Sequence, residues 1–304
     1  MKEDTIMKIN KLYLIAALLG TVLAGCQKEE QGVETPEEQN VKTWTLSLQA
    51  DKAMDAQTKA LDLTTNQETS KEMITATWSA SDDHVYVYKT NGDPLGGVLN
   101  VIEGDGTASA TLSGEITGNL EGVDQLMLVF PRTEWDYSTQ YGLLKDDENS
   151  IESKFDYALA TIDVTEDNGK LTASAASFVN QQSIYRFSFK FGGLDINTKN
   201  VELSSSTNKI VATYNPFTSA MTYSPITLAI ATATTEPVYA AIKHDGNADD
   251  TFRFTVIDND GVTYMGEKAI PSATFSNSFV SVKNVSLGQR LDAALSTTVV
   301  ESAL

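Results

Sequence analysis

The strongest structural signal in the sequence is the stretch Ile184-Tyr185-Arg186-Phe187-Ser188-Phe189-Lys190-Phe191, in which apolar and polar side chains alternate. Successive side chains of a β-strand point to opposite faces of a sheet, so this alternation predicts a strand with one buried face. The same period of two, with many Val, Ile, Thr, Tyr and Phe residues, recurs from Val41 onward. We therefore expect an all-β fold.

Seven further stretches share this pattern. They are residues 44–48, 85–88, 126–130, 209–214, 238–242, 251–257 and 279–287. Segments rich in Gly, Asn and Asp separate them, at 91–94, 104–106, 168–169 and 258–261, and such residues tolerate the positive φ of tight turns. Many short strands with this punctuation are typical of β-sandwiches. No long segment has a helical period, and residues 141–155 read as a polar loop.

A change of composition near Ser177 predicts a domain boundary. Residues 171–180 are rich in Ala and Ser and come directly before the alternating stretch at 184–191. We expect one sandwich over residues 41–177 and a second over 178–304. The roughly 260 residues after the N-terminal segment are enough for two domains of common size.

The N-terminus has the features of a secretory signal peptide covering residues 1–25. Its apolar run over 12–22 is about half the roughly 20 residues that a membrane-spanning helix needs. The run ends in Leu23-Ala24-Gly25-Cys26, which resembles a bacterial lipobox. The resemblance implies that Cys26 becomes the lipidated first residue, and an ordinary signal peptide with a chance cysteine is the alternative. Glu3 and Asp4 are unusual in the positive region of such a signal, which makes Met7 a second candidate start.

Residues 26–40 contain too few apolar side chains to fold and predict a flexible tether. Within it, Gln27-Lys28-Glu29-Glu30 resembles the surface-export signal of Bacteroidetes lipoproteins. That resemblance implies a location on the outer face of the cell outer membrane, although a solvated linker explains the same charges.

The formal net charge of −19 indicates which partners to exclude. A strongly acidic chain repels phosphate backbones, so we expect no nucleic acid partner. It also repels anionic lipid, so membrane attachment has to come from acyl chains on Cys26. Because Cys26 is the single cysteine, its lipidation leaves no thiol for a disulfide, a metal site or a nucleophile.

Candidate catalytic groups are few. His84, where a loop enters a strand, is expected to be salt-bridged to its neighbours, and His244, at a hairpin tip, is expected to be exposed. The acidic clusters at 245–250 and 258–260 lack the spacing of a calcium-binding loop and predict turns instead. No metalloprotease, serine-hydrolase or phosphate-loop motif occurs. We therefore expect no enzyme activity, no metal and no cofactor, while paired glycosidase carboxylates, which converge only in a fold, stay open.

Three aromatic residues could either fill a core or contact sugars. Trp78 lies in a strand-like run, which favours core packing. Trp135 and Tyr137 follow Pro131-Arg132 in a loop, and the sequence leaves their exposure open. If exposed, these two side chains are the candidate glycan contacts.

The order of several motifs resembles the fimbrillin family of Bacteroidetes. A lipobox and a Trp-bearing first strand are followed by Thr77-Trp78-Ser79-Ala80-Ser81-Asp82-Asp83-His84-Val85-Tyr86-Val87-Tyr88 and a Gly-rich hairpin. The run at 107–115 and Val129-Phe130-Pro131 are similar to the next family segments. Asp82-Asp83 stands where Gly-Asp is common in the family. The resemblance covers residues 41–191 most strongly.

The resemblance implies two tandem transthyretin-like β-sandwiches and a pilus subunit that assembles by β-strand addition. In that family a trypsin-like protease cuts beyond the first strand, and a neighbour's strand enters the vacated groove. Here residues 44–48 would be released and Lys52 or Lys59 would be the cleavage site, with an uncut Lys in an exposed loop as the alternative. In the tail at 289–304, residues 295–300 include β-branched side chains that can pair with a sheet edge. We expect this tail to be the donor strand, with a frayed terminus as the alternative.

The implied partners are other fimbrial subunits, of the same or a related kind, the outer membrane and a host or bacterial surface ligand. An alternative function is a surface glycan-binding lipoprotein of a nutrient-uptake system. A third is an enzyme whose acid pair is hidden in the fold.

Overall fold

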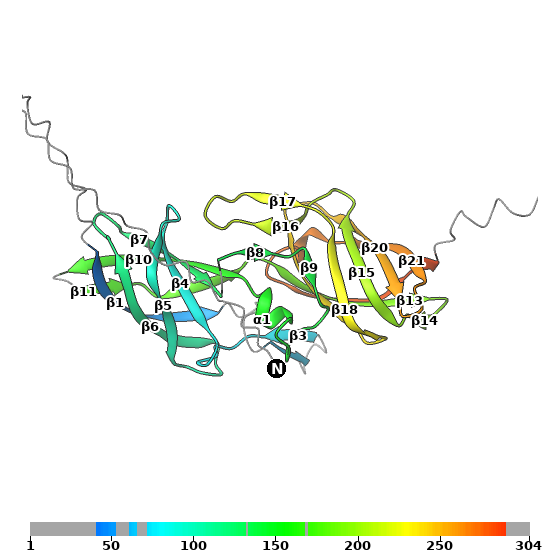
Figure 1. Ribbon diagram of the computed structural model, residues 1–304, viewed down its shortest axis with the longest axis horizontal. Coiled ribbons are helices and arrows are strands. Elements are labelled where there is room, and N and C mark those ends of the chain that lie inside the picture. The colour runs from blue at the N-terminus through cyan, green and yellow to red at the C-terminus, as the bar shows by residue number, and fades with distance from the viewer. Residues whose placement is uncertain (1–40, 53–60, 66–71, 132, 168–169, 290–304) are drawn as a thin grey trace, which may run out of the picture. The chain divides into compact units, whose positions relative to one another are not determined.

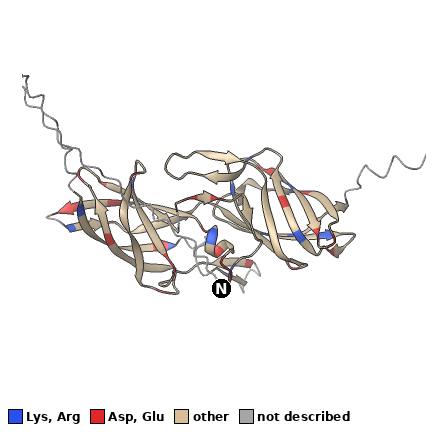
Figure 2. Cartoon of the chain, viewed as in Figure 1, with Lys and Arg blue, Asp and Glu red and all other residues tan. Residues whose placement is uncertain are grey.

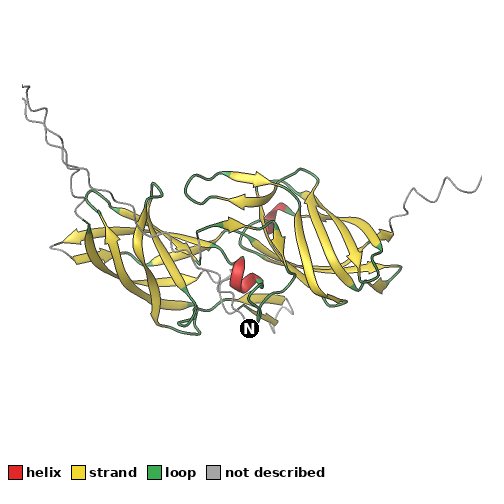
Figure 3. Ribbon diagram, in the orientation of Figure 1, coloured by secondary structure: helices red, strands yellow, loops and turns green. Residues whose placement is uncertain are grey.

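A computed structural model describes residues 41–52, 61–65, 72–131, 133–167 and 170–289. Cys26, Lys59, the turn at 168–169 and the tail at 290–304 lie outside the described residues. Almost every described element is a strand, as Figure 3 shows. The prediction of an all-β fold is confirmed.

The first sheet closes on itself. Its strands are β1 (Lys42–Lys52), β4 (His84–Lys89), β5 (Pro94–Glu103), β6 (Ser109–Gly118), β7 (Gln125–Phe130), β10 (Ala158–Asp167), β11 (Lys170–Ala173) and β12 (Ala176–Asn180). They follow the order β11-β10-β12-β1-β6-β5-β4-β7, and β7 also pairs with β10 (Figure 1). That last pairing completes a ring of strands. β1 lies inside the ring between β12 and β6, and not at an edge.

The remaining strands form two larger sheets and one hairpin. One sheet contains β8 (Trp135–Asp136), β13 (Ser183–Phe191), β14 (Leu194–Asp195), β16 (Ile210–Tyr214), β17 (Met221–Tyr223), β19 (Val238–His244) and β22 (Phe279–Ser286). The other contains β9 (Thr139–Gln140), β15 (Thr198–Ser205), β18 (Ile226–Thr234), β20 (Asp250–Asp258), β21 (Thr263–Ile270) and β23 (Gly288–Gln289). The hairpin pairs β2 (Asp62–Thr65) with β3 (Glu72–Thr75).

Two hydrophobic clusters make up the core. One is built by residues between Trp44 and Phe178, and the other mainly by residues between Ile184 and Leu287. The second cluster also takes Leu61, Ile74, Val129 and the buried apolar side chains between Trp135 and Tyr157. The chain therefore contributes to the second cluster before it reaches residue 178, and a boundary near Ser177 stays a prediction.

Three neighbouring strands of the first sheet are covered on both faces. Val87 in β4 and Phe130 in β7 belong to the first cluster, whereas Tyr86 and Val129 contact the second. β10 behaves in the same way, because Ala160 lies in the first cluster and Leu159 packs against the second. The expectation of half-buried strands is wrong for this part of the sheet, since a second core covers its outer face.

All eight stretches expected to be strands lie in strands. They fall in β1, β4, β7, β13, β16, β19, β20 and β22. The turns are confirmed at Gly92, Gly104, Gly106 and Gly261, all of which have positive φ. The expected loop at 141–155 contains a helical turn, α1 (Ile151–Lys154), in which the Ser150 side chain accepts a hydrogen bond from the Ser153 N–H. A single turn is too short to give a helical period, so the sequence pattern missed it.

Acidic residues outnumber basic ones, 41 to 22, and Figure 2 shows both kinds spread over the strands and their connections. Among the described residues, no helix has the length and apolar character needed to cross a bilayer.

Candidate functional site

The most distinctive structural feature of the closed sheet is the way β1 fills it. β1 pairs antiparallel with β6 from Lys42 to Asp51 and parallel with β12 from Ala50 to Lys52. Every second side chain of β1 is buried. The buried residues are Trp44, Leu46, Leu48, Ala50 and Lys52. One strand thus supplies a row of apolar side chains to the first cluster and ends in a buried cation.

The Lys52 ammonium lies in a polar and aromatic cage. Its Nζ is 3.3 Å from Asp83 Oδ2 and donates a hydrogen bond of 3.0 Å to the Thr77 carbonyl. It also lies 4.0 Å from the centroid of the Trp78 ring and 4.9 Å from that of Phe130. The Lys52 and Asp83 side chains are 1% and 0% exposed, so the pair is desolvated. Trp78 is buried as expected.

The position of Lys52 corrects its interpretation as a cleavage site. A protease has to bind an accessible, extended segment around the bond that it cuts. Lys52 instead belongs to a paired strand, and its own N–H donates to the Ala108 carbonyl at 3.0 Å. Cleavage after Lys52 would require release of this end of β1 first. Lys59 lies outside the described residues, and its role stays a prediction.

Trp135 and Tyr137 are core residues, with exposed fractions of 2% and 0%. The Trp135 ring stacks on Tyr157 at a centroid distance of 5.0 Å. The Tyr137 hydroxyl lies 3.2 Å from the Gln182 side-chain amide. Burial raises the pKa of Tyr137 well above its usual value. The sequence left the exposure of both rings open, and the structure shows that neither presents a face to a sugar.

The two histidines differ in their surroundings. His84 lies at the expected strand edge and is exposed, but its Nδ1 lies 2.7 Å from the neutral Asn100 Oδ1 and not from a charged neighbour. The expected exposure of His244 is wrong, because its side chain is 1% exposed and stacks on Phe275 at 3.7 Å. His244 Nε2 lies 2.9 Å from Asp250 Oδ2. His244 was expected at the tip of a hairpin, but it is the last residue of strand β19 and its side chain lies on the core.

The acidic clusters form turns and internal hydrogen bonds. Asp258 Oδ1 accepts from the Asp260 and Val262 N–H groups at 2.9 and 2.8 Å, which closes the turn between β20 and β21. Asp249 Oδ1 accepts from the Ser272 N–H at 2.7 Å. Among the described residues, no group of three or more His, Cys, Asp or Glu side chains could hold a metal ion.

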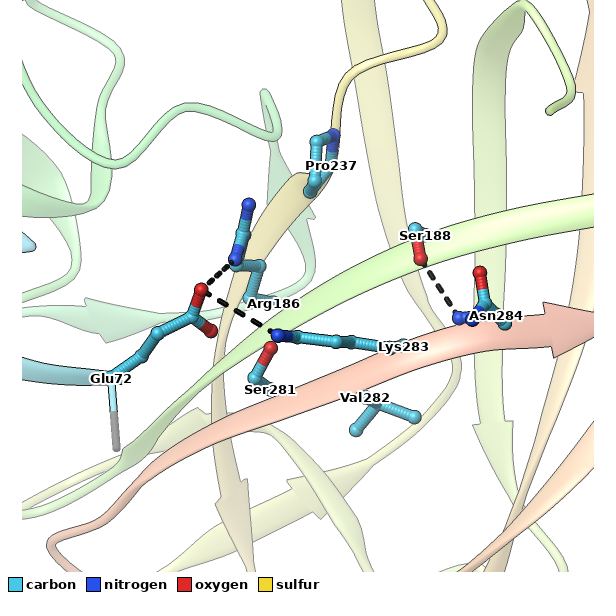
Figure 4. Close-up of a pocket in the computed structure, with 8 residues that line it drawn as sticks. All are labelled: Glu72, Arg186, Ser188, Pro237, Ser281, Val282, Lys283 and Asn284. Atoms are coloured by element: carbon cyan, nitrogen blue, oxygen red, sulfur yellow. Dashed lines mark hydrogen bonds and ion pairs between the residues drawn. The ribbon is translucent and has the colours of Figure 1, made fainter. Parts of the chain in front are cut away.

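A polar hollow of about 260 Å³ lies where β3, β13 and β22 meet (Figure 4). Glu72 Oε1 accepts from Arg186 Nη1 at 2.7 Å and lies 3.7 Å from Lys283 Nζ. Glu72 Oε2 and Arg186 Nε are buried without a hydrogen-bond partner among the described residues. Burial raises the pKa of Glu72, but the neighbouring Ser281 hydroxyl and the Arg186 and Lys283 cations outweigh it and lower the pKa overall. The carboxylate therefore stays an acceptor.

Sequence reasoning missed Asp83, Glu72 and Arg186 as members of these sites. Lys52 lies an even number of residues after Trp44 in the same strand, so both side chains point to the same, buried face. This spacing is a local signal that Lys52 is buried. No local signal exists for the Glu72–Arg186 pair, because 114 residues separate its two members.

No protein-family model and no curated protein matches this sequence. Solved structures do match. A candidate cell adhesion protein from Bacteroides ovatus has a TM-score of 0.42 and 12% identity, over 82% of this chain and 97% of that chain. A second candidate cell adhesion protein, from Bacteroides uniformis, has a TM-score of 0.42 and 13% identity, over 81% of this chain and 96% of that chain. The fimbrial anchor protein of Porphyromonas gingivalis has a TM-score of 0.34 and 10% identity, over 79% of this chain and 90% of that chain. At these identities and scores, the descriptions apply to those proteins alone.

Proposed function

We propose that this protein is a structural or adhesive subunit of cell-surface fimbriae, delivered as a lipoprotein through Cys26 and assembled by β-strand addition. The setting of β1 carries this proposal. A single strand fills the gap between β6 and β12 and inserts side chains at alternate positions. Its removal would leave a groove with a row of pockets, which is the shape that an added strand fills.

Vacating β1 would also leave backbone groups unpaired. β6 pairs with β1 over ten residues, and its N–H and C=O groups would lose these partners. Unpaired buried backbone groups are costly, and a sheet edge with such groups recruits another strand. The opened sheet would therefore bind a partner strand through main-chain hydrogen bonds.

Deletion of the protein in the producing bacterium tests this proposal. Electron microscopy should show loss or shortening of surface fibres, and the wild-type protein should restore them. A Cys26→Ser variant should not, because it removes lipid-dependent delivery. Unchanged fibres together with unchanged adhesion would reject the proposal. N-terminal sequencing of the protein in isolated fibres would show whether the chain starts after Lys59.

The hollow at Glu72 favours a second candidate function, binding of a surface glycan. Its buried carboxylate oxygen Glu72 Oε2 can accept a hydrogen bond and its buried Arg186 Nε can donate one, and neither has a partner among the described residues. A sugar hydroxyl can satisfy both groups, since it is donor and acceptor at once, whereas a carboxylate ligand cannot donate. Met73, Ile74 and Phe279 line an adjoining hollow of about 660 Å³, which provides an apolar surface for a ring.

Electrophoresis through gels that contain polysaccharide tests the second candidate. The wild-type protein should be retarded, and Arg186→Gln should lose the retardation. Arg253→Gln, which removes an exposed arginine of β20, is the matched control and should migrate like the wild type. Equal migration of both variants would reject a glycan site at this hollow.

A further inference from the structure

The C-terminal end of β1 differs chemically from the rest of the strand. Four of its buried side chains are apolar, and the last is Lys52. The carboxylate that it faces belongs to the segment before β4, not to β1 itself. Asp83 is held there by the main chain, because its Oδ2 accepts from the Ser79 N–H at 2.8 Å. If β1 left the sheet, Asp83 would stay in the groove while Lys52 departed.

We propose that any strand that replaces β1 has to carry a Lys or Arg at the position of Lys52. This inference rests on the proposed strand addition. An ion pair with both side chains almost fully buried is costly to break from one side, because the remaining carboxylate loses its cation while it stays desolvated. The aromatic rings of Trp78 and Phe130 favour a cation at the same place. Asp83 therefore selects both the chemistry and the register of the incoming strand.

The tail of this chain does not have the required pattern. Its last cation is Arg290, and no Lys or Arg follows. Aligned in the direction of β1 with Leu295 in one of the four apolar pockets, the tail places Ala303, Glu301, Val299 or Thr297 opposite Asp83. In the reverse direction, Arg290 opposite Asp83 would place Asp292 in the pocket of Ala50 and Ser296 in that of Leu46. Neither direction offers both a cation and apolar side chains.

Because residues 289–304 do not meet this requirement, the proposal assigns the groove to a strand from a different subunit. Its sequence alternates apolar and polar residues over about nine positions and ends in a basic side chain that faces inward.

Strand exchange in the full chain tests the inference. A protease site is inserted between Lys52 and Leu61 of a Cys26→Ser protein, which is then cut. Fluorescent peptides compete with β1 in mild denaturant. The first peptide is residues 42–52. Three variants of it each carry one change, Lys52→Met, Lys52→Arg or Lys42→Met. Two further peptides span residues 290–304, one unchanged and one with Val299→Lys.

We expect Lys52→Met to bind at least about 100-fold more weakly than the wild-type peptide, and Lys52→Arg to recover most of the affinity. Lys42→Met, the matched control at the exposed end of β1, should stay within a few-fold. In an Asp83→Asn protein the preference for Lys52 over Met should fall below about 10-fold. The tail peptide should bind weakly, and Val299→Lys should strengthen it.

Two failures have different meanings. If the wild-type peptide does not enter the cut protein, strand addition at β1 is wrong, and the proposed function fails with it. If it enters and Lys52→Met binds equally well, only the cation requirement is wrong. Tight binding of the unmodified tail peptide would overturn the assignment of the groove to another subunit.

Discussion

Lys52 shows how the alternation of side chains along a strand decides whether a residue is buried or exposed. The resemblance to the fimbrillin family made Lys52 a candidate protease site because it lies at the end of the first strand. Counting alternate residues from Trp44 places Lys52 on the buried face instead. That count predicts burial but not the partner, because Asp83 comes from a segment 31 residues away.

The Asp250 carboxylate should make stability depend on pH. Burial raises the pKa of Asp250, but four hydrogen-bond donors outweigh it and hold the pKa well below its usual range. These donors are Ser205, Ser206, Thr207 and His244. A depressed pKa in the folded state stabilises the protein above the unfolded pKa of about 3.9 and loses this effect as the pH falls.

We therefore expect Asp250→Asn to cost about 3 kcal/mol of unfolding free energy at pH 7 and progressively less below about pH 4. Urea unfolding at a series of pH values measures the difference between variant and wild type. Asp260→Asn, in an exposed turn, is the control and should change stability by less than about 0.5 kcal/mol. A pH-independent cost for Asp250→Asn would contradict this account.

Trp135 should contribute to stability and not to a sugar site. Truncation to Ala removes a buried ring stacked on Tyr157, and we expect a loss of about 3–5 kcal/mol in the free energy of unfolding. Phe191→Ala, whose ring is 41% exposed, is the comparison and should cost about 1 kcal/mol. Denaturant unfolding measures both. A Trp135→Ala protein of wild-type stability that had lost glycan binding would restore the sugar-contact interpretation.

The turn between β4 and β5 shows a constraint on a whole element. Gly92 has a φ of +92°, and a Cβ added there would lie 2.9 Å from the Phe217 Cβ. The neighbouring Tyr88 ring packs on Phe217 at a centroid distance of 4.3 Å. This turn is therefore fixed both by its own backbone and by a loop that packs on the second cluster.

We expect Gly92→Ala to destabilise the protein by about 2–3 kcal/mol, from positive φ and crowding together. Gly122→Ala measures the cost of positive φ alone, because Gly122 has a φ of +71° and open space around it. Its cost should be near 1 kcal/mol. Thermal or urea unfolding compares the two, and equal costs would show that the contact with Phe217 contributes nothing.

At the scale of the whole molecule, the two core clusters share β4, β7 and β10. Val129 and Phe130 are adjacent in the chain and lie in different clusters. Loss of one cluster would expose one face of these strands and would destabilise the other cluster, which packs on their opposite face. We expect the two clusters to unfold together.

The three tryptophans report on this coupling separately. Trp44 and Trp78 lie in the first cluster and Trp135 in the second. A protein that keeps only Trp78 and one that keeps only Trp135, with Phe at the other positions, should give the same denaturant midpoint by fluorescence. Two clearly separated midpoints would show independent domains and would favour a boundary near Ser177.

The sequence by itself determined the local features of this protein. Strands follow from a period of two and turns from Gly, Asn and Asp, because these are properties of neighbouring residues. Among the longer strands it missed β5, β10, β15, β18 and β21, and it could not tell that β4 and β7 are covered on both faces.

Only the tertiary structure decided which side chains meet. The β7–β10 pairing closes the sheet, Asp83 faces Lys52, Glu72 faces Arg186, and Trp135 is buried. Each of these depends on strand order and register between segments far apart in the chain. The period of a single strand fixes which face a residue lies on, but it carries no information about the strand opposite.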